Sequence, residues 1–340
     1  MRPSWRWTMS RKSTAMEMSD LALYQRRPCV EFQKHAPSPM GVFLEIGSDI
    51  GCSVLRYLSD RLSCFAIGVD KSPYFGRGVE NDRVISIEAV GERLPLCDES
   101  VDGIVSIATL EHVSDLGGLL KEVERVLRPG GIFFADYGPI WSGPVGHHVF
   151  AQAGKKEARF WKEGRNPIPD YHHLILNRDE MGQYLAEGPC DDSLLEPVLH
   201  WIYEHNNINR LFFEDYVREF KQSDLDVEIV AGRERHLNPK PSPQLLEKLH
   251  SMHGKRDYSS SYIDVLLRKP GKWLARDLKF DSKIELGQNI LCCPSSGGHL
   301  VYSADQNGYI SKDAGLIYTI DKGVPVMKPH LAKELPTSWR

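Results

Sequence analysis

The stretch Phe43-Leu-Glu-Ile-Gly-Ser-Asp-Ile-Gly-Cys-Ser53 joins an apolar run to a helical pattern. Apolar residues begin at Val42 and stop at Gly47, and after a second glycine at Gly51 the residues Val54, Leu55 and Leu58 fall at helical spacing. Glycines between a strand and a helix let the backbone approach a ligand, which the free N–H groups of the helix then face. Because many such turns bind nothing, the interpretation depends on the rest of the chain.

Composition and charge exclude several classes of protein. The 340 residues are 41% hydrophobic and 26% charged, which indicates a soluble globular protein rather than a disordered one. The formal net charge of −4 gives no general attraction to DNA, RNA or an anionic membrane. No apolar run reaches the roughly 18 residues of a membrane span. The seven cysteines are an odd number without framework spacing, so we expect a reducing, cytoplasmic compartment.

Two regions are distinguished before the chain reaches its C-terminal part. Residues 1–40 form a predicted N-terminal extension, with one helix near 20–33 and a proline-containing linker at 35–39. From residue 41 to residue 270, short apolar strands alternate with amphipathic helices. That alternation predicts an α/β fold with a mostly parallel sheet and helices on both faces.

An acidic residue follows the second predicted strand, at residues 64–69. Asp70 lies 19 positions beyond Gly51, where a carboxylate at a strand end can accept hydrogen bonds from both hydroxyls of an adenosine ribose. The alternative is that Asp70 caps the segment that begins at Ser72. The combination of glycine turn and acid favours ribose binding.

Five motifs in the order of the chain carry a resemblance to a known family. They are Leu44-Glu-Ile-Gly-Ser-Asp-Ile-Gly51, Gly68-Val-Asp70, Gly91-Glu-Arg-Leu-Pro-Leu96, Val101-Asp-Gly-Ile-Val-Ser106 with Leu110-Glu-His-Val113, and Leu127-Arg-Pro-Gly-Gly131. Over residues 41–137 the chain resembles the class I S-adenosylmethionine-dependent methyltransferases, in particular those of ubiquinone and menaquinone biosynthesis. The resemblance implies a Rossmann-like sheet of seven strands with the last strand antiparallel, and S-adenosyl-L-methionine as cofactor.

The resemblance also implies which residues contact the cofactor. Glu45, Gly47 and Gly51 would border its methionine part, Asp70 would hold the ribose, and Gly91 would flank the adenine. The full predicted set is Glu45, Gly47, Ser48, Asp49, Gly51, Asp70, Lys71, Gly91, Glu92, Ser106, Ile107 and Ala108.

The chain departs from the family pattern at two of its positions. Asp49 replaces the middle glycine of the turn, and aspartate tolerates left-handed backbone angles better than most residues. Val90 replaces the acid that holds the adenine amino group, which leaves backbone hydrogen bonds and weakens binding there. These departures keep one alternative of another class, a catalytically silent cofactor-binding scaffold.

The segment 138–223 is expected to be a helical cap that shapes the acceptor pocket. It is too long for a plain connection, and it begins where substrates sit in open α/β sheets. Histidine near its ordinary pKa suits a general base, so His147, His148, and His172 with its neighbour His173 are candidate catalytic residues. Tyr137 is a further candidate. The alternatives are a cap core built from these rings, or metal ligation by the two histidine pairs. To His112 we assign a structural role.

The C-terminal part of the chain is predicted to be a separate small domain. Strands at 225–230 and 262–267 flank a helix at 242–250 and close the core, and a linker covers 271–283. Residues 284–335 resemble the small zinc-ribbon activator subunit that partners tRNA, ribosomal RNA and release-factor methyltransferases. The pattern Cys293-Pro-Ser-Ser296, together with Ser311, lacks the expected thiolates. We therefore predict a metal-free β-rich domain that covers an exposed edge or apolar patch of the core.

The sequence as a whole favours one function over two others. We expect a cytoplasmic S-adenosylmethionine-dependent methyltransferase that acts on oxygen or carbon of a small-molecule or glycan-type acceptor. The alternatives are the silent scaffold and an RNA or translation-factor methyltransferase with a fused activator domain, although the net charge argues against RNA. The identity of the acceptor and the oligomeric state stay open.

Overall fold

The computed structural model describes most of the chain. The described residues are 16–38, 41–79, 81–188, 190–234, 240–276, 278, 280 and 282–336. The first 15 residues of the predicted N-terminal extension, Pro39 of its linker and parts of the linker at 271–283 lie outside this set.

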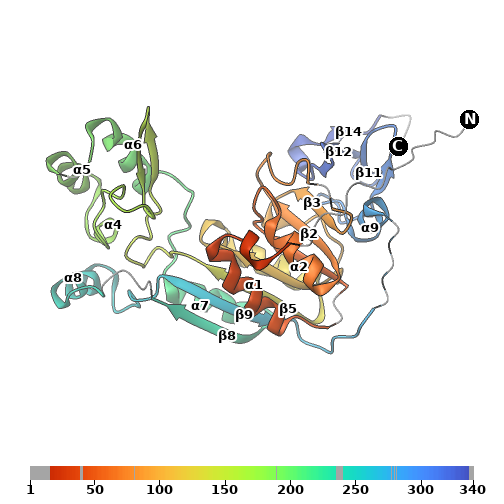
Figure 1. Cartoon of the computed structure of the whole chain (residues 1–340), viewed down its shortest axis with the longest axis horizontal. Helices are drawn as coiled ribbons and strands as arrows, with labels where there is room; N and C mark the ends of the chain where they lie inside the picture. Colours follow the sequence, from red (N-terminus) through yellow and green to blue (C-terminus); the bar gives the residue numbers. More distant parts are fainter. Residues whose placement is uncertain are drawn as a thin grey trace, which may run out of the picture.

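A seven-stranded sheet with the order β3-β2-β1-β4-β5-β9-β8 forms the centre of the molecule (Figure 1). The strands are β1 (Val42–Ile46), β2 (Phe65–Asp70), β3 (Val84–Glu88), β4 (Val101–Ile107), β5 (Leu127–Tyr137), β8 (Asp226–Arg233) and β9 (Tyr262–Arg268). The first five are parallel, whereas β9 lies antiparallel between β5 and β8. The predicted Rossmann-like fold, with its last strand antiparallel, is confirmed.

Helices cover both faces of this sheet because successive strand residues point to opposite sides. Phe43 of β1 packs with α1 (Leu23–His35) and α2 (Ser53–Leu62). Leu44, its neighbour, packs with α3 (Leu116–Val126) and α7 (Phe213–Gln222) on the other face. Four short 3-10 helices complete the set: η1 (Met18–Asp20), η2 (Gly91–Arg93), η3 (Leu110–His112) and η4 (Pro329–Leu331).

The insertion after β5 forms a cap that lies apart from the sheet, on the left of Figure 1. It holds α4 (His172–Ile175), α5 (Arg178–Glu187) and α6 (Asp192–Tyr203) around an apolar cluster that includes Met181 and Val198. The expectation of a helical cap is incomplete, because β6 (Phe150–Ala153) and β7 (Lys156–Arg159) form a two-stranded sheet there. Helix α8 (Pro243–His253) packs on α4 through Leu249 and Leu174.

The β-rich C-terminal region lies on the opposite side of the sheet from the cap (Figure 1). It comprises α9 (Lys283–Ile290), β10 (Val301–Ser303), β11 (Gly308–Ser311), β12 (Leu316–Asp321), β13 (Val324–Pro325) and β14 (Lys333–Glu334). It attaches to the edge strand β3, where Met327 N donates to Glu88 O at 2.8 Å and Val326 bridges to Glu88. The Lys328 ammonium adds bonds of 2.8 Å to Glu88 Oε1 and 2.7 Å to Lys71 O.

A disulfide between Cys97 and Cys292 crosses the same junction, and the cysteine pattern gave no reason to expect it. The other five cysteines are free.

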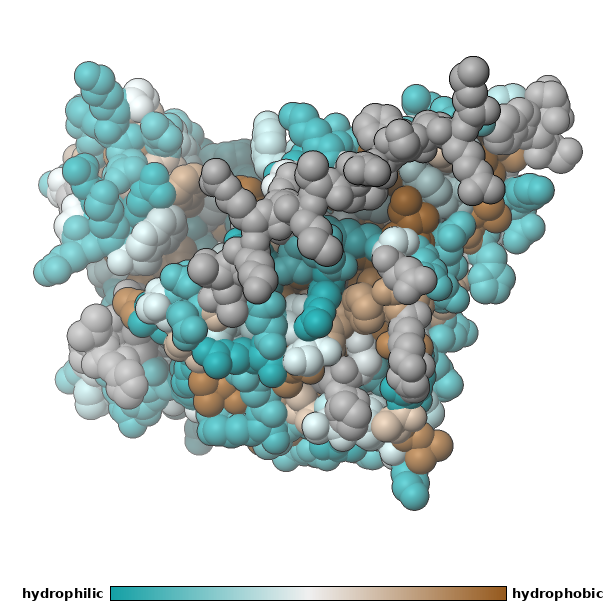
Figure 2. Space-filling model, turned by 45° about the vertical axis from the view of Figure 1, so that its right-hand side comes forward, coloured by the Kyte–Doolittle hydropathy of each residue, from teal (hydrophilic) through white to brown (hydrophobic). Residues whose placement is uncertain are grey.

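The surface gives two further facts. Figure 2 shows that hydrophilic residues cover most of the face in view and that hydrophobic residues occur there in small separate groups. No helix within the described ranges is long and apolar enough to cross a membrane.

Candidate cofactor and acceptor site

The glycine turn after β1 depends on Gly47 and Cys52 for its backbone shape. Gly47 has φ +77°, and a Cβ placed on it would lie 2.1 Å from the Thr109 hydroxyl oxygen, so only glycine fits. Cys52 has φ +55° and directly precedes α2. Asp49 has no positive φ, which corrects our reason for accepting an aspartate in the turn.

The side chain of Asp49, rather than its backbone, explains its presence. Its carboxylate accepts hydrogen bonds from Gly51 N at 2.8 Å and Ser53 N at 3.0 Å, and it therefore caps the start of α2. It also accepts a bond of 3.1 Å from Gln25 Nε2 in α1. The departure at position 49 thus joins the N-terminal helix to the predicted cofactor turn.

A buried carboxyl lies beneath the turn. Glu45 is 1% exposed and accepts a hydrogen bond of 2.5 Å from Ser48 Oγ. Burial, together with the nearby carboxylates Asp49 and Asp70, raises the pKa of Glu45 to about 8. A ligand with positive charge beside Glu45 would favour its ionised form, so this position fits a cationic group.

Asp70 lies at the end of β2, as predicted, and has one oxygen engaged. Its Oδ1 accepts a hydrogen bond of 2.7 Å from Ser72 N, so the capping role that we held as the alternative is present in the structure. Oδ2 has no hydrogen bond within the described ranges and can serve a ligand. Burial raises the pKa of Asp70 above 3.8. The exposed Lys71 contributes its carbonyl to Lys328.

The remaining predicted cofactor residues differ in their access to a ligand. Gly91 and Glu92 lie in η2, directly after Val90, which is 40% exposed. Ser106 is buried and donates to Ile46 O at 2.9 Å, so its hydroxyl ties β4 to β1 instead of facing a ligand. Ile107 is also buried, whereas Ala108 is exposed at the strand end.

Helix α1 is fixed at the carboxyl end of β5 by a network of two arginines and two aspartates. Arg27 of α1 pairs with Asp136 and lies 2.9 Å from Asp264 Oδ2. Arg233 of β8 binds the same two carboxylates at 2.6 and 2.9 Å. The N-terminal helix is therefore held at both the glycine turn and the acceptor side of the sheet.

His112 lies at the end of η3, five residues beyond Ile107, the last residue of β4. Its Nδ1 is 2.7 Å from Asn207 O, so Nδ1 carries the proton and Nε2 carries a lone pair. Nε2 has no hydrogen bond within the described ranges, and the residue is partly exposed. Burial lowers the pKa of His112 below 6.5, which keeps the ring neutral near pH 7.

The predicted catalytic histidines do not form one group. The His148 ring lies edge-on to His112 at 5.4 Å and stacks on Phe160, and its Nε2 is engaged with Pro139 O at 2.5 Å. His147 lies instead in the cap core, 1% exposed, with its ring 5.2 Å from that of His173.

Neither buried histidine of the first pair favours proton transfer. Burial lowers the pKa of His148 to about 3 and that of His147 well below 6.5. His172 lies at the start of α4, with its ring 5.6 Å from Tyr184, and is not in contact with the other pair. The buried setting of His147 matches the cap-core alternative.

Within the described ranges, two buried side-chain oxygens behind the strand ends lack hydrogen-bond partners. The Tyr137 hydroxyl and Glu111 Oε2 are both buried and unpaired, and Glu111 Oε1 accepts from Gly138 N at 3.1 Å. Burial raises the pKa of Glu111 to about 8. Our sequence analysis did not select Glu111, although it lies in the Leu-Glu-His-Val motif beside His112.

Ser296 and Ser311, which stand where a zinc ribbon would have thiolate ligands, lie close together in the C-terminal region. Ser296, Ser311 and Tyr318 surround Cys293 Sγ with hydrogen bonds, the Tyr318 hydroxyl at 3.3 Å. Among the described residues, no group of three or more His, Cys, Asp or Glu side chains is placed to hold a metal ion.

Comparison with known proteins identifies the class of the central segment. Residues 44–135 match the family described as a methyltransferase domain, and this segment includes every predicted cofactor contact. The matched segment is less than half of the chain. These residues are therefore similar to a methyltransferase domain, and they include most of β1, strands β2 to β4 and most of β5.

Individual relatives cover only parts of the chain. An uncharacterized methyltransferase of Mycobacteroides abscessus is 36% identical over 106 residues, which are 29% of this chain and 40% of the relative. One from Mycobacterium avium is 31% identical over 164 residues, 46% of this chain and 64% of the relative. The chain thus spans less than two thirds of these relatives. Among solved structures, an S-adenosylmethionine-dependent methyltransferase from Mesorhizobium loti has 16% identity and a TM-score of 0.44, over 74% of this chain and 100% of that chain.

Proposed function

We propose that the protein is an S-adenosylmethionine-dependent methyltransferase that transfers a methyl group to oxygen or carbon of a small-molecule or glycan-type acceptor. His112 is its general base. The observation that carries this proposal is the arrangement of His112: a neutral imidazole beyond β4 whose tautomer is fixed by the Asn207 carbonyl.

The residues at the ends of β1 and β2 suit the cofactor. Glu45 offers a carboxyl that a positive charge would ionise, and Asp70 offers a carboxylate oxygen without a partner in the described chain. When bound there, the cofactor supplies an electrophilic methyl group on a sulfonium. The protein's own part is to position the acceptor and to remove its proton.

For a hydroxyl acceptor, His112 Nε2 would take the proton as the methyl group is transferred. Its lone pair is available because Nδ1–H donates to Asn207 O, and its lowered pKa keeps the ring neutral near pH 7. His148 supports this ring by edge-on contact, whereas its own Nε2 is committed to Pro139. We therefore transfer the catalytic role from His147, His148 and His172 to His112.

Calorimetry and a labelled-methyl screen test this proposal. S-adenosylhomocysteine should bind to the full chain, and failure to bind would refute the proposal. Binding without methyl transfer to any fraction would support the silent-scaffold alternative. A screen with methyl-labelled cofactor against metabolite, glycan and RNA fractions should then label a metabolite or glycan. Label in RNA alone would favour the alternative of an RNA methyltransferase.

Substitutions of histidine test the assignment of the base. His112→Gln should lower turnover by about 10²- to 10⁴-fold while the affinity for S-adenosylhomocysteine changes little. His172→Gln is the matched control, because His172 lies in the cap away from His112, and it should keep native turnover. Native turnover in a folded His112→Gln variant would refute the assignment.

A further inference from the structure

A cavity of about 470 Å³ lies where the C-terminal region meets the core. It is bounded by the loop 93–98, by α3 and by residues 292–299, and all three of Cys97, Cys292 and Cys293 line it. Cys97 is partly exposed, whereas Cys292 is 7% exposed. A small molecule that entered this cavity would therefore meet the Cys97–Cys292 disulfide, of which Cys97 is the more exposed residue.

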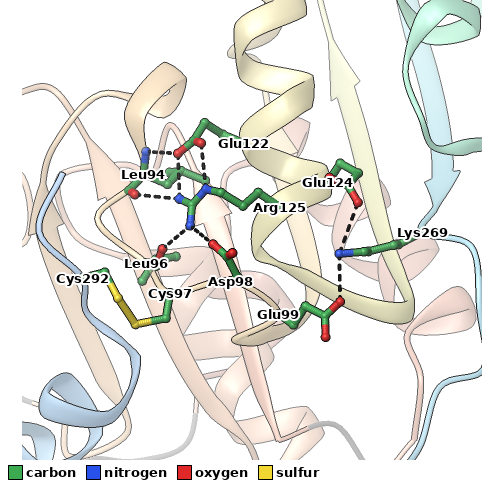
Figure 3. A network of polar contacts seen from close by, with 10 residues as sticks. All are labelled: Leu94, Leu96, Cys97, Asp98, Glu99, Glu122, Glu124, Arg125, Lys269 and Cys292. Atoms are coloured by element: carbon green, nitrogen blue, oxygen red, sulfur yellow. Dashed lines mark hydrogen bonds and ion pairs between the residues drawn. A yellow bond between two sulfur atoms is a disulfide. The ribbon is translucent and has the colours of Figure 1, made fainter. Parts of the chain in front are cut away.

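Residues 91–97 form the loop that carries Cys97, and this loop is held from two sides. On one side Arg125 of α3 donates to Leu94 O at 3.0 Å and to Leu96 O at 2.6 Å, and Glu122 accepts from Leu94 N (Figure 3). Arg125 and Glu122 therefore both connect α3 to this loop by hydrogen bonds.

On the other side the C-terminal region pairs with the same loop. Cys97 N donates to Ile290 O at 2.9 Å, and Cys292 N donates to Pro95 O at 3.1 Å. The disulfide lies beside this short pairing and joins residues 195 positions apart (Figure 3). It is the covalent part of a contact that also contains these backbone hydrogen bonds and the apolar packing of Leu96 with Leu291.

The cavity is lined both by a disulfide, Cys97–Cys292, and by a free thiol, Cys293. Burial alone would raise the pKa of the Cys293 thiol, but hydrogen bonds with Ser296, Ser311 and Tyr318 outweigh it and set the pKa at about 7. A thiolate is thus accessible near neutral pH beside a disulfide. Five of the seven cysteines in the described chain are free thiols, a pattern that fits an environment where disulfides are transient and redox-sensing.

We propose that this cavity is a thiol–disulfide exchange site, which takes a low-molecular-weight thiol and controls how firmly the C-terminal region holds the loop 91–97. A thiolate attacks Cys97 Sγ, forms a mixed disulfide with it and releases Cys292 as a thiolate, which takes up a proton. A second thiol then frees Cys97 and leaves as the symmetric disulfide. Two thiols are oxidised and the protein disulfide is reduced to two thiols.

We infer that the exchange is linked to cofactor binding, and this part of the inference rests on the proposed function. The loop begins at Gly91 and Glu92, the predicted adenine contacts, and Cys97 ends it. Breaking the covalent link leaves the loop with its hydrogen bonds and its apolar packing but without its covalent tether, so its adenine-binding conformation is less populated. Reduction should therefore weaken cofactor binding.

The first experiment measures the exchange itself. The folded full chain is equilibrated in buffers of reduced and oxidised glutathione and then alkylated, and its peptides are analysed by mass spectrometry. We expect a Cys97–Cys292 peptide under oxidising conditions, and both cysteines alkylated under reducing conditions without denaturant. A pair that stays oxidised until the protein is unfolded, or an oxidised protein without this pair, would overturn the proposal.

The second experiment measures the link to the cofactor. We expect S-adenosylhomocysteine to bind at least about 3-fold more weakly to the reduced protein. Cys97→Ser and Cys292→Ser should show the weaker affinity under both conditions, and Cys190→Ser, a free cysteine of the cap, should respond like the native protein. Equal affinity of the oxidised and the reduced native protein would overturn the link, even if the variants do not fold. Absence of binding in both states would refute the proposed function and leave the alkylation result to decide on exchange.

Discussion

Replacing Asp70 by asparagine separates the two roles of this carboxylate. Oδ1 accepts the Ser72 N–H at 2.7 Å, and Oδ2 is the oxygen that we expect to bind the ribose of the cofactor. Asparagine keeps an acceptor for Ser72 but removes the charge. A hydrogen bond to a charged group contributes about 1.5–3 kcal/mol, so the Kd for S-adenosylhomocysteine should rise about 10- to 150-fold.

Calorimetry on folded variants measures this change. Asp82→Asn, the same chemical change on the exposed turn before β3, is the matched control and should keep native affinity. Asp70→Ala should weaken binding similarly and, because it also loses the bond to Ser72, lower the free energy of unfolding by about 0.5–2 kcal/mol. Native affinity in a folded Asp70→Asn variant would refute the placement of the ribose at this strand end.

Four other outcomes are expected. Turnover should rise with pH to a plateau with a midpoint below pH 6.5, because burial lowers the pKa of His112 and only the neutral ring accepts a proton. A midpoint above pH 6.5 in the pH–rate profile would contradict this. Gln25→Ala, which removes the 3.1 Å bond to the glycine turn, should weaken S-adenosylhomocysteine binding about 2- to 12-fold in calorimetry, the equivalent of about 0.5–1.5 kcal/mol, and unchanged affinity would separate α1 from the site. Lys328→Met, which leaves Glu88 without one of its cations, should lower the free energy of unfolding in urea by about 1.5–3 kcal/mol, and an unchanged midpoint would make this ion pair unimportant. Elemental analysis should find no stoichiometric zinc, and one zinc per chain after dialysis would contradict the metal-free interpretation.

The parallel part of the central sheet could be predicted from the sequence because strands β1, β3 and β4 are buried on both faces. All five residues of β1 are buried, and four of them are apolar, so the strand stands out before the glycine although Glu45 interrupts the apolar run. The boundary between α3 and β5 is harder to place from the sequence: the helix ends at Val126, and Leu127 already pairs with Val101. That pairing is long-range and has no local signal.

The cap sheet and the disulfide were missed for physical reasons. Strands β6 and β7 are rich in alanine, lysine and glutamate, whose local preference is helical, and only their mutual pairing makes them strands. Cys97 and Cys292 are 195 residues apart and follow no spacing rule.

The role of His112 could not be read locally either. It depends on the Asn207 carbonyl, which comes 95 residues later in the chain. The motif therefore indicated where a histidine lies, whereas only the folded chain indicates which of its nitrogens is free.

The attachment of the C-terminal region to β3 has a consequence for biosynthesis. Strand β3 is the edge of the parallel sheet, and the C-terminal region covers it through β13, residues 326–328 and α9. While the chain is being made, the first 270 residues can form the sheet before those residues emerge, and the open edge then exposes unpaired backbone groups that favour aggregation. Residues of the C-terminal region, which are made after the seven strands of the sheet, thus close the exposed edge of a domain that is otherwise already folded.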